Sequence, residues 1–199
     1  MAAVTEEQPK SPRVRLFVAL DLPEETRDGL VTWGREQLTD PALRPVAPES
    51  LHITLAFLGH RPEEEIEAIA AAVRESAAPA PWVELRDPEQ RPPRGRARLY
   101  ALPAISPGAE ALQAGLEQRL VEGGFYEPEK RPFWPHVTVA RVRAEARGSR
   151  RPAVVSESPG PLPEELSEPR LAVRMALYRS VLQSSGAHYV PLAQVELPG

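Results

Sequence analysis

The sequence contains no cysteine and no long apolar run. Without cysteine there can be no disulfide framework, no thiol nucleophile and no cysteine-bound zinc or iron–sulfur site. No apolar stretch approaches the roughly 20 residues that a membrane-spanning helix requires. The first residues also lack the basic-then-apolar pattern of a secretion signal. We therefore expect a cytoplasmic protein that makes no contact with a membrane.

Positive charge is also in short supply, since the net charge at pH 7 is −4. That sign disfavours bulk, non-specific binding of nucleic acid, although it leaves room for a small basic groove. With 199 residues, of which 42% are hydrophobic, the chain can form one domain or two small lobes that share a core. Residues 1–12 are polar and aperiodic, so we expect a disordered tail before a single domain over residues 13–199.

Proline, in contrast, is abundant: 24 residues, about twice the usual ~5% share. Most prolines lie between periodic segments, which indicates stiff loops. The longest of these segments, residues 143–169, is expected to be a surface loop.

Hydrophobic periodicity predicts strands and helices in irregular alternation. Helices are expected after Pro23, from Pro62 and from Ser106-Pro107. Gly59 is expected to end a strand, and Ser184-Ser185-Gly186 to form a hairpin turn. Because the alternation lacks the rhythm of a doubly wound sheet, the predicted fold class is α+β. The predicted strands span residues 13–21, 50–58, 81–86, 96–102, 134–142, 171–182 and 187–197.

One short pattern occurs twice. Residues 52–56 read His-Ile-Thr-Leu-Ala, and residues 136–140 read His-Val-Thr-Val-Ala. Alternate residues of a strand share a face, so the His, Thr and Ala of each repeat are expected to point one way. The small alanine would then leave room for a ligand. Either pentapeptide alone is typical of a half-buried strand, but the repetition favours two lobes that each offer one His-x-Thr strand to a shared groove.

Such a groove suits phosphodiester transfer. Two imidazoles with an ordinary pKa of about 6.5 can act as acid and base in one turnover. Threonine hydroxyls can donate to phosphate oxygens whose charge increases in the transition state. No carboxylate cluster accompanies either repeat, and a zinc site built from His52, His136 and a carboxylate is disfavoured because no short-range ligand pair is present. A peptidase is disfavoured because there is no Gly-x-Ser-x-Gly motif and no cysteine.

Similarity to a known family extends over nearly the whole chain. It is carried by residues 15–21, 51–59, 135–141 and 177–180, and by Gly186, Tyr189 and Leu192. With these residues the sequence resembles the 2H phosphoesterases, and among them the RNA 2′,3′-cyclic phosphodiesterases of bacteria and archaea, also called 2′–5′ RNA ligase-like (ThpR/LigT) proteins. The resemblance implies two α+β lobes related by a pseudo-two-fold axis, with antiparallel sheets, flanking helices and a central cleft.

The resemblance also implies a reaction: hydrolysis of a terminal 2′,3′-cyclic phosphate on RNA to a 2′-phosphomonoester, without metal or cofactor. It makes His52 the proton donor to the departing O3′ and His136 the proton acceptor that activates water. Thr54 and Thr138 would bind the phosphate oxygens, and Arg141 would add charge-assisted contacts. Strict alternation puts Arg141 on the face opposite His136, so this last role requires a bulge or a strand end.

Aromatic and basic residues elsewhere give further candidates for substrate binding. Phe17 and Tyr100 could each stack on a base, with core packing as the alternative. Arg94, Arg96 and Arg98 precede Tyr100 and could attract RNA phosphates, or could belong to a solvated loop. The expected partner is an RNA with a 2′,3′-cyclic phosphate end, tRNA-like or an oligonucleotide, and the protein is expected to be a monomer.

Two alternative functions remain open. The same site could act on a 2′–5′ oligonucleotide or a small cyclic nucleotide, or could catalyse the reverse ligation. The chain could instead be an RNA-end-binding module with negligible catalysis. Loss of one histidine or threonine from the repeats would mark such a module, and both pairs are present.

Overall fold

Antiparallel strands make up most of the molecule. The computed structural model describes residues 11–183 and 186–199, and the α+β class predicted from the sequence is confirmed. The strands are β1 (Arg13–Asp21), β2 (Leu43–Pro45), β3 (His52–Pro62), β4 (Trp82–Leu85), β5 (Glu89–Arg91), β6 (Leu99–Ile105), β7 (His136–Val142), β8 (Arg170–Leu171), β9 (Arg174–Gln183) and β10 (Gly186–Glu196).

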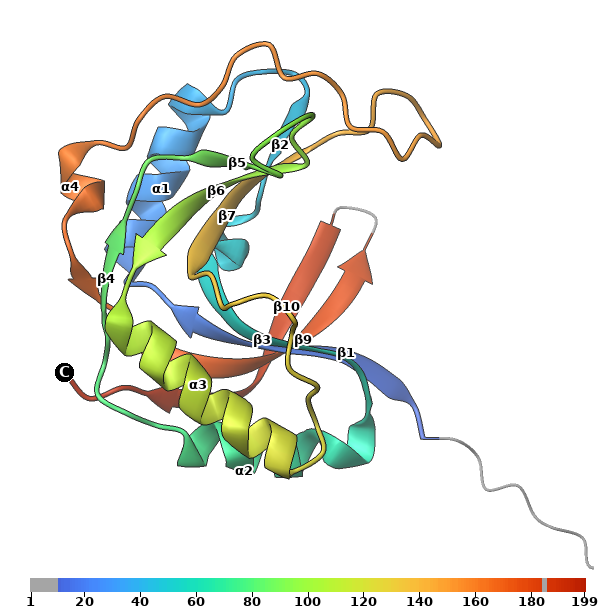
Figure 1. The fold of residues 1–199 in the computed structure, drawn as a ribbon, viewed down its shortest axis with the longest axis vertical. Coiled ribbons are helices and arrows are strands. Elements are labelled where there is room, and N and C mark those ends of the chain that lie inside the picture. Colours follow the sequence, from blue (N-terminus) through green and yellow to red (C-terminus); the bar gives the residue numbers. More distant parts are fainter. Residues whose placement is uncertain (1–10, 184–185) are drawn as a thin grey trace, which may run out of the picture.

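The strands join into one curved sheet in the order β10-β9-β1-β3-β7-β6-β4-β8, with β2 beside β7 and β5 beside β6 (Figure 1). The link between β3 and β7 is a single antiparallel residue pair, Ile53 with Val137. On either side of this pair each strand turns to its own neighbours, β1 for β3 and β6 for β7. The sheet therefore has two halves that meet at one point, as the resemblance implied.

Within residues 11–183 and 186–199, four α-helices accompany the sheet: α1 (Glu24–Gln37), α2 (Ile66–Glu75), α3 (Pro107–Glu122) and the short α4 (Glu164–Ser167). The first and third begin where the sequence predicts. Pro23 precedes α1, and the Ser106 hydroxyl caps α3 by accepting a hydrogen bond from the Ala109 N–H at 3.2 Å. Figure 1 shows α2 and α3 side by side below the β1–β3–β9 half. Among the described residues, no helix has the length and apolar character needed to cross a membrane.

The buried side of the sheet is aliphatic. The largest fully buried side chains include Leu16, Leu20, Ile53, Leu102 and Leu177, and burial of each such side chain contributes roughly 1.5–3 kcal/mol. The same cluster takes in Leu116 and Leu120 of α3. Because one sheet face is used in this way, the polar side chains of the His-x-Thr repeats must lie on the other.

Gly59 does not end the second strand, so that prediction is wrong. β3 continues through it to Pro62. Gly59 has φ of +68°, a conformation that costs glycine little because it has no Cβ. The register shifts there, since Phe17 pairs with Phe57 and Leu16 pairs with Gly59. The glycine thus allows an irregularity within a long strand.

The proline-rich segment 143–169 is a strap fixed to α1 and to the loop that follows α1. The Asp40 carboxylate accepts hydrogen bonds from the N–H groups of Ser156 (2.7 Å) and Glu157 (3.0 Å). The Trp33 indole donates to the Pro161 carbonyl at 3.0 Å. These bonds, and the small helix α4, give order to a segment that the sequence analysis treats only as a loop.

Two sequence predictions fall at least partly outside the described residues. Of the expected tail, residues 1–10 lie outside them, and β1 begins at Arg13 as expected. The expected Ser184-Ser185-Gly186 turn includes residues 184–185, which also lie outside, while the flanking β9 and β10 pair in an antiparallel register.

Candidate active site

The register between β3 and β7 brings the two repeats together. Ile53 and Val137 are paired and both are fully buried. Directly opposed residues of an antiparallel pair share a face, and their sequence neighbours share the other face. The histidine and threonine of each repeat flank this pair, so all four polar side chains lie on the cleft face. The histidine of each repeat is placed across from the threonine of the other.

A cavity of about 1180 Å³ opens beside this group and is lined by both His136 and Thr54. Arg91, Phe57 and Trp134 also line it. His52, Thr138 and Arg141 are not among the lining residues, so the cavity adjoins the site on the side of His136. A space of this size can admit a nucleotide-sized ligand.

The alanine of the first repeat does not face the cleft. In the β1–β3 register Ala19 pairs with Thr54 and Val18 pairs with Ala56, so Leu55 is an extra residue on β3. Such a β-bulge reverses the alternation of side chains. Ala56 therefore points into the core, where it is 3% exposed. The prediction that this alanine shares a face with His52 and Thr54 is therefore wrong, although Ala56 is among the residues that line the cavity.

The second repeat has the same bulge. Val139 is the extra residue between Thr138 and Ala140 in the pairing of β7 with β6. Ala140 is consequently in the core, with 0% exposure, so the prediction is wrong for this alanine as well. The bulge places the next residue, Arg141, on the same face as His136. It supplies the irregularity that a role for Arg141 requires.

Arg141 has a basic neighbour that the sequence analysis missed. Arg44 of β2 pairs directly with it in the register, and both side chains are exposed. Within the described part of the chain, neither has an ion-pair or hydrogen-bond partner. Like charges directly opposed across two strands destabilise a sheet unless an anion compensates them. Arg44 could not be found from the sequence because the three-residue strand β2 has no periodic signal.

His52 is held by its backbone surroundings and by aromatic rings. Its Nδ1 lies 3.2 Å from the Glu49 carbonyl oxygen, which can only accept, so Nδ1 carries the proton and Nε2 is free. The Phe17 ring stacks on the imidazole with 5.2 Å between centroids. The side chain is only 9% exposed. Burial lowers the pKa of His52, and the nearby charge of Asp21 opposes that shift.

His136 is held in a corresponding way by different residues. Its Nδ1 lies 2.7 Å from the Trp134 carbonyl oxygen, which again leaves Nε2 free. The Trp134 ring stacks on the imidazole at 4.1 Å between centroids. The Arg91 guanidinium lies over the same indole, 3.7 Å from its centroid. Burial lowers the pKa of His136, and the positive charge of Arg91 lowers it further.

Asp21 is a buried carboxylate beside the first histidine. It pairs with His52 in the β1–β3 register, and its side chain is 8% exposed. Its Oδ2 accepts hydrogen bonds from Arg174 Nε and from the Tyr178 hydroxyl, each at 2.7 Å. Burial and this carboxylate together raise the pKa of Tyr178. The sequence analysis gave Asp21 no role, although Asp21 ends a buried strand and belongs to residues 15–21, which carry the resemblance.

Neither aromatic residue proposed as a base-stacking contact offers a free face. Phe17 is buried between the rings of His52, Tyr178 (5.3 Å) and Tyr189 (4.8 Å). Tyr100 is 3% exposed on the core face, and its hydroxyl lies 3.2 Å from Ser158 Oγ. The structure therefore favours the core-packing alternative for both residues.

The arginines that precede Tyr100 separate in the structure. Arg96 binds the strap, through Glu145 at 2.8 Å and the Pro152 carbonyl at 2.9 Å. Arg98 lines the cavity beside His136. Arg94 is exposed and is not among the residues that line that cavity. The cluster thus divides into one structural residue, one cavity residue and one surface residue.

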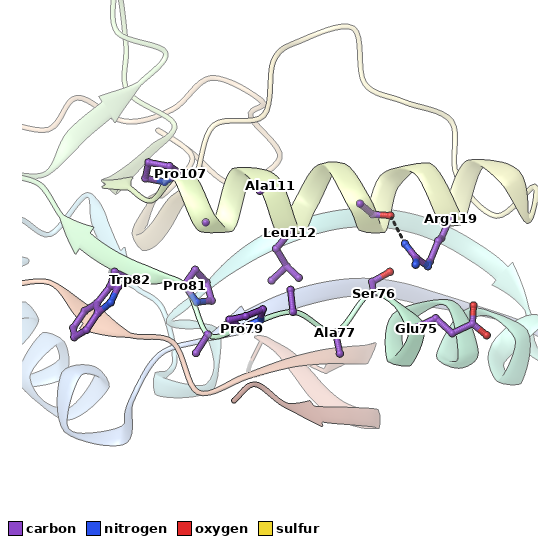
Figure 2. A pocket seen from close by; sticks show the side chains of 14 residues that line it. Glu75, Ser76, Ala77, Pro79, Pro81, Trp82, Pro107, Ala111, Leu112 and Arg119 are labelled. Carbon is purple, nitrogen blue, oxygen red and sulfur yellow. Dashed lines mark hydrogen bonds between the residues drawn. The ribbon is translucent and has the colours of Figure 1, made fainter. Parts of the chain in front are cut away.

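Other parts of the molecule offer less to a reaction. Across the described ranges, no three side chains of His, Asp or Glu are grouped so as to hold a metal ion. A second hollow of about 650 Å³ lies between the end of α2, residues 77–82 and α3 (Figure 2). Pro79, Pro81 and Leu112 line it, and no residue of the repeats reaches it.

Comparison with known proteins gives concordant results. A family model described as the 2′-5′ RNA ligase superfamily matches residues 23–173. The RNA 2′,3′-cyclic phosphodiesterase of Thermus thermophilus is 36% identical over 193 residues, 94% of this chain and 91% of that protein. The crystal structure of TT0787 from the same species has a TM-score of 0.74 at 34% identity, covering 93% of this chain and 98% of that one. The structure of E. coli LigT complexed with NADP+ has a TM-score of 0.73 at 28% identity, covering 95% and 100%.

Proposed function

Because the chain belongs to the 2′-5′ RNA ligase superfamily, we propose that it hydrolyses the terminal 2′,3′-cyclic phosphate of RNA to a 2′-phosphomonoester. The observation that carries the proposal is the Ile53–Val137 pair, which puts two His-x-Thr repeats on one face of the sheet. The Thermus thermophilus relative is named for this activity and is aligned with nearly all of this chain.

In this reaction His136 acts as the base and His52 as the acid. Nε2 of His136 accepts a proton from water as the water oxygen attacks phosphorus. The bond from phosphorus to O3′ breaks, and Nε2–H of His52 gives its proton to that oxygen. The products are a 2′-phosphate and a free 3′-hydroxyl, and the two histidines exchange protons with solvent before the next turnover. The Nδ1 bonds to backbone carbonyls support these roles because they direct both Nε2 atoms away from the backbone.

The remaining polar groups would bind the phosphate. The hydroxyls of Thr54 and Thr138 would donate to its non-bridging oxygens, whose negative charge increases as water attacks. Arg141 would add a charge-assisted contact from the same face. Arg44, directly beside Arg141, would contact the same phosphate or the preceding one.

The test uses purified protein and a short RNA that ends in a 2′,3′-cyclic phosphate. We expect turnover, a product with its phosphate only on the 2′ oxygen, and equal rates with and without EDTA. A 3′-phosphate product, or a chelator that abolishes activity, would contradict the proposal. NADP+ and NAD+ form a matched inhibitor pair because only NADP+ carries a ribose 2′-phosphate, as the product does. NADP+ should therefore inhibit more strongly.

A second reaction at the same site is supported by the description of the matching family, the 2′-5′ RNA ligase superfamily. If the 5′-hydroxyl of another RNA replaces water as the nucleophile, the same proton transfers form a 2′,5′-phosphodiester. Adding an excess of 5′-hydroxyl oligonucleotide to the assay would reveal the joined product. Binding of the cyclic-phosphate RNA with neither product would favour a non-catalytic RNA-end-binding module.

We also propose that the protein works as a monomer in the cytoplasm. Both repeats come from one chain, so the site needs no second copy. Light scattering on the purified protein would give its mass in solution, and a dimer would contradict the proposal.

A further inference from the structure

The two cleft histidines have neighbouring side chains of opposite charge. Asp21, an anion, is the cross-strand partner of His52. Arg91, a cation, lies over the indole that stacks on His136. The two repeats are otherwise alike in backbone register and in their Nδ1 bonds, so this difference in charge separates two sites of similar geometry.

The Asp21 carboxylate is well placed to act on His52. It is 8% exposed, whereas its partner Arg174 is 30% exposed, so solvent screens the cation more than the anion. Glu196 lies 3.9 Å from Arg174 and offsets part of that positive charge. The hydrogen bonds from Arg174 and Tyr178 fix the position of the carboxylate beside His52.

Arg91 is held against the second histidine by stacking. Arg91, Trp134 and His136 form a continuous stack, with 3.7 Å and 4.1 Å for its two contacts. Glu89 pairs with Arg91 at 3.0 Å, but the carboxylate is 53% exposed and the guanidinium 30% exposed. The cation is therefore the less screened member of the pair, and it disfavours a second positive charge on His136.

Other charged or titratable groups surround the two rings. His52 faces Asp21 of β1, His136 of β7, Tyr178 of β9 and Tyr189 of β10, and Arg174 of β9 binds the Asp21 carboxylate. His136 faces Arg91 of β5 and His52 of β3. The cavity beside it also contains Arg98, Glu117, Glu129, Lys130 and Arg131.

From this arrangement we propose that Asp21 and Arg91 are positioning residues that fix the direction of proton transfer, with His52 as the acid and His136 as the base. The inference rests on the proposed function and deepens it. An anion behind His52 keeps that imidazole protonated to higher pH. A cation behind His136 keeps that imidazole neutral to lower pH. The active form of the enzyme, with one ring charged and the other neutral, then persists over a wider pH range.

The two charges make separate predictions for the pH dependence of kcat/KM. The base sets the acidic limb of the bell-shaped profile, and the acid sets the alkaline limb. Asp21→Asn should move the alkaline limb to lower pH, by about 0.5 or more. Arg91→Gln should move the acidic limb to higher pH by a similar amount. Each substitution narrows the pH profile of kcat/KM from a different side. A general loss of structure would not shift one limb and leave the other in place.

Conservative variants separate charge from packing. Asp21→Glu and Arg91→Lys keep the charges, so their limbs should stay near the wild-type positions even where the maximal rate falls. Glu84→Gln and Arg86→Gln serve as matched controls because those residues form a partly exposed pair at 2.8 Å on and beside β4. Both controls should leave the profile unchanged.

A direct measurement needs no turnover. NMR titration of the histidine ring signals of the substrate-free protein should show His52 titrating at lower pH in Asp21→Asn and His136 at higher pH in Arg91→Gln. If wild-type protein lacks activity but these shifts occur, the proposed function fails and the charge effect stands. If activity is present but the ring signals and both limbs do not move, the assignment of Asp21 and Arg91 is wrong.

Discussion

The two halves of the cleft have the same backbone design and different chemistry. In each, a strand presents His and Thr to the cleft, bulges at the next residue, turns its alanine into the core and returns the following side chain to the cleft. That returning residue is Phe57 in one half and Arg141 in the other. The supports of the histidines differ as well, with Phe17 stacked on His52 and Trp134 on His136.

The difference shows which parts of the site depend on the backbone and which depend on single side chains. Nε2 orientation follows from strand register and from a carbonyl acceptor in both halves. Charge, in contrast, is carried by residues outside the repeats or at their ends. A duplicated scaffold can therefore become an acid on one side and a base on the other without any change in its pairing.

Removing either cleft imidazole should produce the largest loss of catalytic rate. We expect His52→Ala and His136→Ala each to reduce kcat by about 10²-fold or more, because general acid–base catalysis contributes ~10²–10⁴-fold. The measurement is single-turnover cleavage of the cyclic-phosphate RNA. The exposed residue His60 supplies the control, since His60→Ala should cleave at the wild-type rate. Near-normal turnover by both His52 and His136 variants would remove the basis for a two-histidine mechanism.

The threonines test whether the halves contribute equally to the phosphate. Thr54→Val and Thr138→Val keep the shape of the side chain and remove its donor. A hydrogen bond to a charged group is worth about 1.5–3 kcal/mol, so each variant should lose about 10- to 100-fold in kcat/KM. If only one of the two substitutions lowered kcat/KM, the phosphate would lie closer to that half of the cleft. The symmetric placement of the phosphate oxygens would then be wrong.

Phe57 and Arg141 occupy equivalent positions and should respond differently to salt. Arg141→Gln should lower kcat/KM by about 10-fold at low ionic strength, because a charge-assisted contact is lost, and by less at high ionic strength. Arg44→Gln should show the same trend with a smaller loss. Phe57→Leu should change activity without changing its salt dependence, because no charge is removed. Kinetics at two salt concentrations distinguish these outcomes.

The sequence was sufficient for most of the longer elements and for bringing the two repeats into one cleft, but not for the short elements β2, β5, β8 and α4 or for the bulges. Strand β1 and the starts of α1 and α3 follow from alternation, proline and capping residues. The sequence could not predict which sheet face carries Ala56, Ala140 and Arg141. A single extra residue in a strand reverses the alternation of side chains, and residue composition does not reveal it. β2, with Arg44, was missed because a strand of three residues carries no period.

Contacts between distant segments were equally hidden. Nothing local in the sequence shows that Arg91 lies on Trp134 or that Asp21 accepts from Tyr178, since these pairs are joined only by the tertiary fold. The same limit explains Tyr100, whose place among strand residues near arginines suggested the cleft. Its face is set by the register with Ala140, which puts it in the core.

The smallest expected effect is on the free energy of unfolding, and it also differs between the two halves of the cleft. The pKa of each cleft histidine is lowered in the folded protein, so below pH ~6.5 the unfolded chain binds more protons and acid favours unfolding. His52→Gln should reduce the loss of unfolding free energy between pH 7 and pH 5, by an amount on the order of 1 kcal/mol. His136→Gln should reduce it less, because His136 is only half-buried, and His60→Gln should not change it. Urea denaturation at the two pH values measures these differences, and equal relief by all three variants would show that burial of the cleft histidines does not govern the acid sensitivity.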